Sequence, residues 1–252
     1  TDVRICLRPV GSLVASSEVR IDLLKAQQEV RIKSLELKPN IEALCQLTEG
    51  TDAQFEVEIL VGGESRYKNV YDLHLMPYDY WLSTKNRPEL TSCFCQPSLP
   101  EVERICFNAA KLLEQRTGES MMNGYLSNNP NYVRAQIAAI YEALRQEGLH
   151  YVVPPASFEQ EGQRVRMADR VLIEKRGTCL DTALLMASCL EHSGIEPLIV
   201  LFHGHAIVGA RLVADSCPLV LDDPTYLTKG ISDGIDDIVL IESTCLCFNM
   251  EG

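Results

Sequence analysis

The first eighty residues alternate polar and apolar side chains with a period of two. In FEVEILV (55–61), apolar residues alternate with glutamates and the run ends at Gly62-Gly63. Shorter runs of the same kind occur at 3–7, 19–24 and 29–37. A period of two indicates strands that turn one face toward a core and one toward water. The pattern predicts an antiparallel β-sandwich over residues 1–95.

After a polar, proline-marked passage that begins near residue 83, the periodicity becomes helical. In NNPNYVRAQIAAIYEALRQEG (128–148), apolar residues recur every three or four positions between Asn129-Pro130 and Gly148, which predicts a helix. Ser98 and Pro100 predict the cap and first turn of an earlier helix, which reaches about residue 115. A short helix is expected in MADRVLIEKRG, ended by Gly177. We therefore expect an α+β domain over residues 96–252.

Charge and cysteine content narrow the class of protein. A formal charge of −12 repels phosphate backbones, so we expect no direct nucleic-acid binding. The longest apolar run, near 196–202, is too short to span a bilayer, and no secretory signal opens the sequence. Ten cysteines, mostly in apolar contexts, favour free thiols and a cytoplasmic location. Because the sequence begins with Thr1 and stops just after a strand-like run, we expect a fragment of a longer chain.

The sequence RGTCLDTALLMASCLEHSG (176–194) carries the strongest chemical signal. Thr178 and Asp181 have the spacing of a capping box, which makes Cys179 the first helical residue. The positive end of a helix, with a cation nearby, lowers a thiol pKa to about 3.5–7.5, so an activated nucleophile is expected. The amide of Cys179 would also serve an oxyanion hole. The helix is apolar on nearly all sides and should cross the core.

A base and an acid must accompany such a nucleophile. The strand-like run after HGH offers His203 and His205, which parity places on one face, so the pattern leaves both open. Two acids follow strand-like runs: Asp223 (or its neighbour Asp222) in LVLDDPT, and Glu242 in IVLIEST. Taken alone, a cysteine at a helix start is more often structural, and each acid is more often a solvated loop residue.

The sequence RGTCLDTALLMASCLEHSGIEPLIVLFHGHAIVG resembles the transglutaminase-like branch of the papain-like cysteine enzymes. The resemblance extends upstream through residues 128–166 and MPYDYW, so it covers roughly residues 70–245. It is closest to domains of large bacterial multidomain proteins that carry helicase-like regions. The β-rich module that precedes such domains is similar to residues 1–95. The resemblance implies Cys179 as nucleophile, His205 as base and Glu242 as the acid, preferred over Asp223 because its strand looks more central. It also implies Gln163 as an oxyanion donor.

Two functions from different classes follow. The first is a cysteine-dependent acyl-transfer enzyme, a peptidase or a deamidase or transglutaminase, that acts on protein or peptide amides without a cofactor. The second is a catalytically lapsed interaction or scaffold module of a longer chain. A metal site is a weaker possibility, built from HGH with Cys217 or from the Cys-x-Cys pairs at 93–95 and 245–247. We expect no metal, because those pairs lie in apolar, strand-like sequence.

Overall fold

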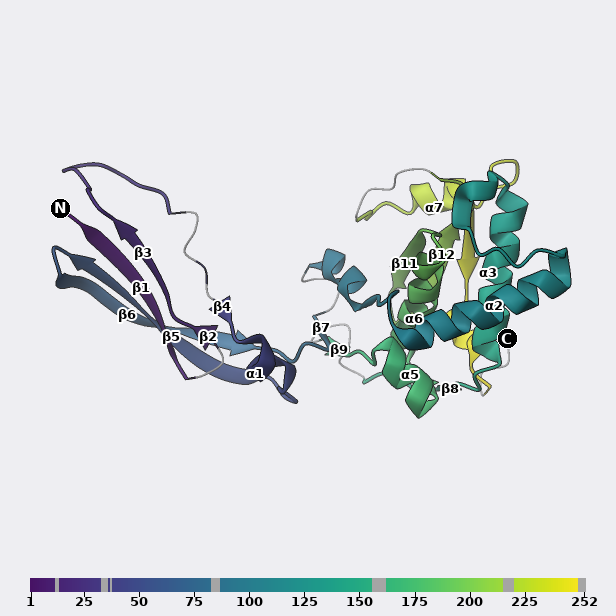
Figure 1. The fold of residues 1–252 in the computed structure, drawn as a ribbon, viewed down its shortest axis with the longest axis horizontal. Helices are drawn as coiled ribbons and strands as arrows, with labels where there is room; N and C mark the ends of the chain where they lie inside the picture. Colours follow the sequence, from purple (N-terminus) through teal and green to yellow (C-terminus); the bar gives the residue numbers. More distant parts are fainter. Residues whose placement is uncertain are drawn as a thin grey trace. The chain divides into compact units, whose positions relative to one another are not determined.

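The computed structural model describes residues 1–11, 14–32, 36, 38–82, 87–155, 162–214 and 220–248. It is a mixed α/β structure with antiparallel sheets and several helices (Figure 1). The chain divides into two compact units, Thr1–Tyr78 and Asp79–Gly252. Within the described residues, none of the helices has the length and apolar character needed to cross a membrane.

The first unit is built on a four-stranded antiparallel sheet with the order β3-β1-β5-β6. Its strands are β1 (Val3–Val10), β3 (Ser17–Ile21), β5 (Thr51–Val61) and β6 (Glu64–Leu75). A second pair, β2 (Val14–Ala15) with β4 (Lys38–Pro39), and the short helix α1 (Ile41–Cys45) complete it. Gly62 and Gly63 connect β5 to β6 with positive φ at both positions, which favours glycine in a tight hairpin turn.

The predicted sandwich is not confirmed in the described part of this unit. A sandwich needs a second sheet against the first, but the other pairing here is the two-residue pair β2–β4. The buried apolar side chains that the structure gives this unit are Val3, Cys6, Leu7 and Val14, and β6 is exposed along most of its length. Of the strand predicted at 29–37, residues 29–32 are not extended into a sheet, and 33–35 and 37 lie outside the described residues.

The second unit packs helices against a three-stranded antiparallel sheet with the order β11-β12-β13. Its helical elements are η1 (Pro88–Phe94), α2 (Pro100–Thr117), η2 (Gly124–Ser127), α3 (Pro130–Arg145), α5 (Ala168–Glu174), α6 (Cys179–His192), α7 (Thr225–Gly230) and η3 (Ser243–Leu246). Its strands are β7 (Tyr80–Trp81), β8 (His150–Tyr151), β9 (Gln163–Arg164), β10 (Arg176–Gly177), β11 (Pro197–Phe202), β12 (His205–Arg211) and β13 (Ile238–Ile241). The strand β13, predicted to be central, lies at an edge of this sheet as described.

The division between the units comes earlier in the chain than the boundary expected near residue 95. Strand β7 pairs with β9, and Trp81 and Phe94 pack in one cluster with residues of α6. Residues 79–82 and 87–95 therefore belong to the second unit, because Trp81 and Phe94 are buried there, while Leu82 and Leu90 stay exposed. The change of sequence pattern placed the boundary near residue 95, whereas these long-range contacts assign residues 79–82 and 87–95 to the second unit.

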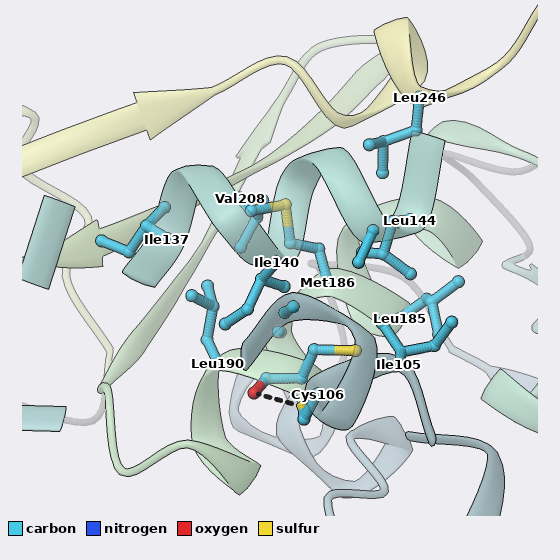
Figure 2. Close-up of a cluster of buried hydrophobic side chains, with 14 of the residues drawn as sticks. Ile105, Cys106, Ile137, Ile140, Leu144, Leu185, Met186, Leu190, Val208 and Leu246 are labelled. Carbon is cyan, nitrogen blue, oxygen red and sulfur yellow. Dashed lines mark hydrogen bonds between the residues drawn. The ribbon is translucent and has the colours of Figure 1, made fainter. Parts of the chain in front are cut away.

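Helix α6 forms the centre of the core of the second unit. Every residue from Cys179 to Leu190 is buried, as the apolar sequence predicts. Figure 2 shows the side chains of α6 interleaved with those of α2, α3 and β12, among them Ile105, Ile140 and Val208. A helix buried on all sides holds its first residue in a fixed place, which matters for the chemistry at Cys179.

The predicted ends of the other helices agree only in part with the structure. Helix α3 begins as expected, because the Asn129 side chain accepts a hydrogen bond from the amide of Asn131 at 3.0 Å. Helix α2 has Pro100 in its first turn, but its N-cap is Leu99 rather than Ser98, and no side chain caps it. Helix α5 ends at Glu174, before the predicted Gly177, because Lys175 takes a left-handed conformation and the chain continues into β10.

Replacement of Leu190 by alanine tests the central place of α6. Leu190 is fully buried, so Leu190→Ala should lower the free energy of unfolding by about 2–5 kcal/mol, through lost burial and the cavity left behind. Urea denaturation followed by circular dichroism measures this change. Leu126→Ala, at a leucine that is 83% exposed, is the control and should change stability by less than about 0.5 kcal/mol. Equal effects of the two variants would contradict the packing.

Candidate active site

Cys179 is the first residue of α6, and the capping box predicted for this helix is confirmed. The Thr178 hydroxyl accepts a hydrogen bond from the Asp181 amide at 3.3 Å, and the Asp181 carboxylate accepts one from the Thr178 amide at 2.9 Å. The first amides of a helix have no partner within it. Both residues are buried, so these bonds replace the water that an exposed helix end would bind.

Asp181 also fixes a second segment against the start of the helix. Its carboxylate accepts hydrogen bonds from the Arg166 amide at 2.9 Å and from the Arg166 guanidinium at 3.2 Å. Burial raises the pKa of Asp181, although the donors from Thr178 and Arg166 oppose that shift. The sequence predicted the capping role of Asp181 but not this link to the chain that follows β9.

The Cys179 thiol lies in an apolar cluster, which we call the cysteine cluster. Its members are Trp81, Phe94, Val165, Cys179, Leu180, Leu184 and Ala206. Cys179 is 1% exposed, and burial raises the pKa of its thiol. Hydrogen bonds to the sulfur from the amides of Ala206 and Leu180 and from the Tyr151 hydroxyl lower the pKa in part. The low thiol pKa expected from the sequence is therefore wrong for this structure, because desolvation outweighs these donors.

His205 and Glu242 form the polar half of the site. Nε2 of His205 lies 2.7 Å from a carboxylate oxygen of Glu242. The other oxygen accepts hydrogen bonds from the Thr244 amide at 3.0 Å and hydroxyl at 2.7 Å. Burial acts to raise the pKa of Glu242, but the bonds from His205 and Thr244 outweigh it and hold the pKa below its usual value. An ionised Glu242 accepts the Nε2 proton and leaves Nδ1 with the free lone pair.

The start of β12 brings the cysteine and the histidine to one end of the sheet. His205 is the first residue of β12 and Ala206 is the second. The Ala206 side chain packs in the cysteine cluster, and the His205 side chain contacts Glu242. His205 is therefore the neighbour in sequence of a residue that packs with Cys179. It is not among the groups that shift the Cys179 pKa most.

A buried hydroxyl contact connects the helix of Cys179 to the loop of Glu242. The Thr182 hydroxyl lies 3.2 Å from the Ser243 hydroxyl, and it also donates toward the Thr178 and Cys179 carbonyls at 3.1 Å. Thr182 and Ser243 are both fully buried. This contact fixes the residue after Glu242 against the first turn of α6, so the two halves of the site share one support.

The remaining candidate site residues are His203, Asp223, Asp222 and Gln163. His203 is exposed in the turn between β11 and β12, and Asp223 accepts hydrogen bonds from the amide and hydroxyl of Thr225 at 2.9 and 2.6 Å. Asp222 is also exposed. Gln163 is buried on β9, two residues before Val165 of the cysteine cluster, and its amide oxygen has no hydrogen-bond partner among the described residues. The geometry therefore places Glu242, and not Asp223, against His205.

Tyr151 is the site residue that the sequence did not predict. It lies on the two-residue strand β8, which pairs in parallel with β10 just before the helix cap. Its ring packs against the cysteine cluster, and its hydroxyl is one of the groups that lower the pKa of Cys179. The sequence LHYVVPP indicates a strand, but nothing in its local pattern shows which element that strand joins.

The metal hypothesis receives no support from the described residues. No group of three or more histidine, cysteine, aspartate or glutamate side chains there could hold a metal ion. Cys217 lies outside the described residues. The two Cys-x-Cys pairs occur at 3-10 helices, η1 and η3, rather than in strands as predicted, and Cys93 is exposed.

Comparison with known proteins gives one likeness of limited extent. No protein-family model and no curated protein matches the chain. Among solved structures, the chain is similar to a crystal structure of a candidate protease from Parabacteroides distasonis, with 16% identity and a TM-score of 0.27. The match covers 65% of this chain and 36% of the other, so this chain spans little more than a third of that structure. A TM-score at this level does not establish a common fold.

Replacement of Asp181 by asparagine tests the support of the helix start. Each carboxylate oxygen accepts a backbone amide, and an asparagine would turn an N–H₂ group toward one of these donors. We expect Asp181→Asn to lower the free energy of unfolding by about 1–3 kcal/mol, measured by urea denaturation. Asp233→Asn, at an exposed aspartate, is the control and should have little effect. A neutral result at Asp181 would show that the network does not stabilise the helix start.

Proposed function

We propose that the chain is a cysteine-dependent acyl-transfer enzyme that acts on amide bonds of protein or peptide substrates. The observation that carries the proposal is the 2.7 Å contact between Glu242 and His205, whose neighbour Ala206 packs in the cluster that contains Cys179. A nucleophile, a base and a group that orients the base are the parts that covalent acyl transfer requires.

The proposed reaction begins with a proton transfer. Because burial keeps the Cys179 thiol protonated at neutral pH, Nδ1 of His205 takes its proton as the sulfur attacks the substrate carbonyl carbon. A sulfur–carbon bond forms and the carbonyl π electrons move to oxygen. When the tetrahedral intermediate collapses, the carbon–nitrogen bond breaks and the imidazolium gives its proton to the leaving amine or ammonia. Glu242 stabilises the positive imidazolium during these steps.

The thioester that remains can be resolved in two ways. Water attack releases a carboxylic acid, which makes the enzyme a peptidase or a deamidase, whereas amine attack forms a new amide, which makes it a transglutaminase. In both cases His205 removes a proton from the attacking group and returns one to the Cys179 sulfur. The amide of Cys179, at the helix start, is proposed as an oxyanion donor, and Gln163 as a second.

The proposal extends to the family and to the rest of the protein. Cys179 lies at a helix start, His205 at the start of a strand, and Glu242 just after the neighbouring strand. This order supports a transglutaminase-like, papain-like arrangement of the second unit. Under this proposal the chain is part of a longer multidomain protein, and its partner at the site is a peptide segment. No cofactor takes part in the proposed steps.

A second candidate function is favoured by the burial of the nucleophile. A thiol that is 1% exposed is typical of a structural cysteine, and a scaffold could keep the core of an enzyme after catalysis has lapsed. Under that reading the chain is an interaction module of a longer protein. The two candidates differ in whether the reactivity of Cys179 depends on His205 and Glu242.

Labelling with a peptide vinyl sulfone separates the two candidates. We expect the wild-type protein to be modified at Cys179 and Cys179→Ala to remain unmodified at this position. His205→Ala should slow the modification by about 100-fold or more through loss of the base, and Glu242→Gln by roughly tenfold or more through loss of its orientation. Mass spectrometry of the peptide that contains Cys179 gives the rates.

Two matched variants serve as controls for this experiment. His203→Ala and Asp223→Asn remove the alternative histidine and acid, and both should be labelled at the wild-type rate. Equal rates for the wild type, His205→Ala and Glu242→Gln would reject the enzyme and leave the scaffold. Slowing by Asp223→Asn rather than Glu242→Gln would reassign the acid.

A further inference from the structure

Strand β6 forms one edge of the sheet in the first unit, and its outer side is open in the described part of the chain. It pairs with β5 on one side, and none of the described residues pairs with it on the other. Residues 64–72 are all exposed, among them the large side chains Tyr67, Val70 and Tyr71. Every second residue of an edge strand turns its backbone N–H and C=O groups away from the sheet, so β6 can accept another antiparallel strand.

The regular part of this edge runs from Tyr67 to Leu75. The register with β5 shifts between Tyr67 and Ser65, so Arg66 has no pairing partner in β5. A bulge of this kind interrupts regular pairing on that side of the strand. Bulges, prolines and short length are the usual protections of an open edge. From Tyr67 onward β6 has no bulge and no proline, so it keeps the backbone geometry of a strand that can pair.

The charges of β6 suit a second copy of the same strand. Two acidic residues, Glu64 and Asp72, balance two basic ones, Arg66 and Lys68, although the chain as a whole carries a charge of −12. A strongly charged partner of either sign would therefore gain little from this edge. When two copies of β6 pair antiparallel about Val70, Lys68 of each copy lies opposite Asp72 of the other. Opposite charges at directly facing positions stabilise a pair of strands, and like charges destabilise it.

Neighbouring registers lack this match. Residues that face each other across two strands share one face of the sheet, so the apolar faces of two copies align only when the pairing is centred on a residue. A centre at Tyr71 places Lys68 opposite His74, and a centre at Asp72 places two carboxylates opposite each other. A centre one residue before Val70 brings the bulge into the pairing. The register about Val70 is therefore the one that pairs opposite charges within the regular part of the strand.

We propose that β6 is a dimerisation edge, at which two copies of the chain pair antiparallel about Val70 and join their four-stranded sheets into one. A twofold axis through this point relates the copies, so the contact between Lys68 and Asp72 occurs twice. Tyr67 of each copy then lies opposite Leu73 of the other, which shields part of the exposed ring. The net charge of the chain opposes association in general, so the local match at β6 has to outweigh it. The inference does not depend on the chemistry at Cys179.

Reversal of the two charges, one at a time, tests both the dimer and its register. Two copies of Lys68→Glu would set acidic side chains against Asp72, and two copies of Asp72→Lys would set basic side chains against Lys68. We expect the wild-type chain to sediment as a dimer, and each variant alone to have a dimer Kd roughly tenfold or more above that of the wild type. Sedimentation equilibrium of the full chain measures these constants.

An equimolar mixture of the two variants makes the test specific to this register. In the mixed dimer both contacts again join opposite charges, so its Kd should lie within about threefold of the wild-type value. A variant that had only lost its fold would not recover in the mixture. Lys25→Glu makes the same change of net charge at an exposed lysine outside β6, and it should dimerise like the wild type. Circular dichroism verifies that each variant remains folded.

Three results would overturn the proposal. A wild-type chain that stays monomeric at its highest soluble concentration would leave the edge of β6 to a strand from another protein. A dimer that Lys68→Glu and Asp72→Lys leave unchanged would place the association elsewhere, for example on the apolar face of the sheet. Loss of the dimer in each variant without recovery in the mixture would reject the pairing about Val70.

Discussion

The amino end of α6 lies inside the protein, where the first amides of the helix cannot bind water. A buried amide that is left unpaired costs about 1–3 kcal/mol. At the cap, the Thr178 hydroxyl pairs the Asp181 amide and the Asp181 carboxylate pairs the Thr178 amide, and the same carboxylate binds the backbone after β9. The position of Cys179 follows from this network. Because Cys179 directly follows the cap residue Thr178, the hydrogen bonds of the cap also fix the position of Cys179.

The burial that fixes Cys179 also opposes its ionisation. An apolar environment disfavours a thiolate, and here desolvation exceeds the effect of the donors around the sulfur. The site counters this in two ways. Amide and hydroxyl donors stabilise the charge on the sulfur, and His205, oriented by Glu242, is the proposed destination of the proton. In such a site the thiolate need not persist at rest, since it forms as it attacks.

Local patterns in the sequence predicted much of the second unit. The helical periodicity of α3, the apolar sequence of α6 and the Thr178–Asp181 spacing correspond to the structure because each depends on residues a few positions apart. Long-range pairing was not predictable in this way. The contact of β7 with β9 moved the boundary of the unit, and the ladder of β8 with β10 brought Tyr151 against the cysteine cluster. A period of two likewise shows that a strand has two faces, but not whether a second sheet covers one of them.

The choice of acid illustrates the same difference. Asp223 and Glu242 both follow strand-like runs and both precede a threonine by two residues, so the sequence alone favours neither on its local pattern. Both carboxylates accept hydrogen bonds from that threonine, which is a local turn contact available to either. Only Glu242 also reaches His205, because β13 pairs with β12 and ends beside the start of that strand. The side chains of His205 and Glu242 are 34% and 42% exposed, whereas Cys179 is buried. Under the proposed function, a substrate would therefore approach the sulfur from the side of the imidazole, which is also where the thiol proton would leave.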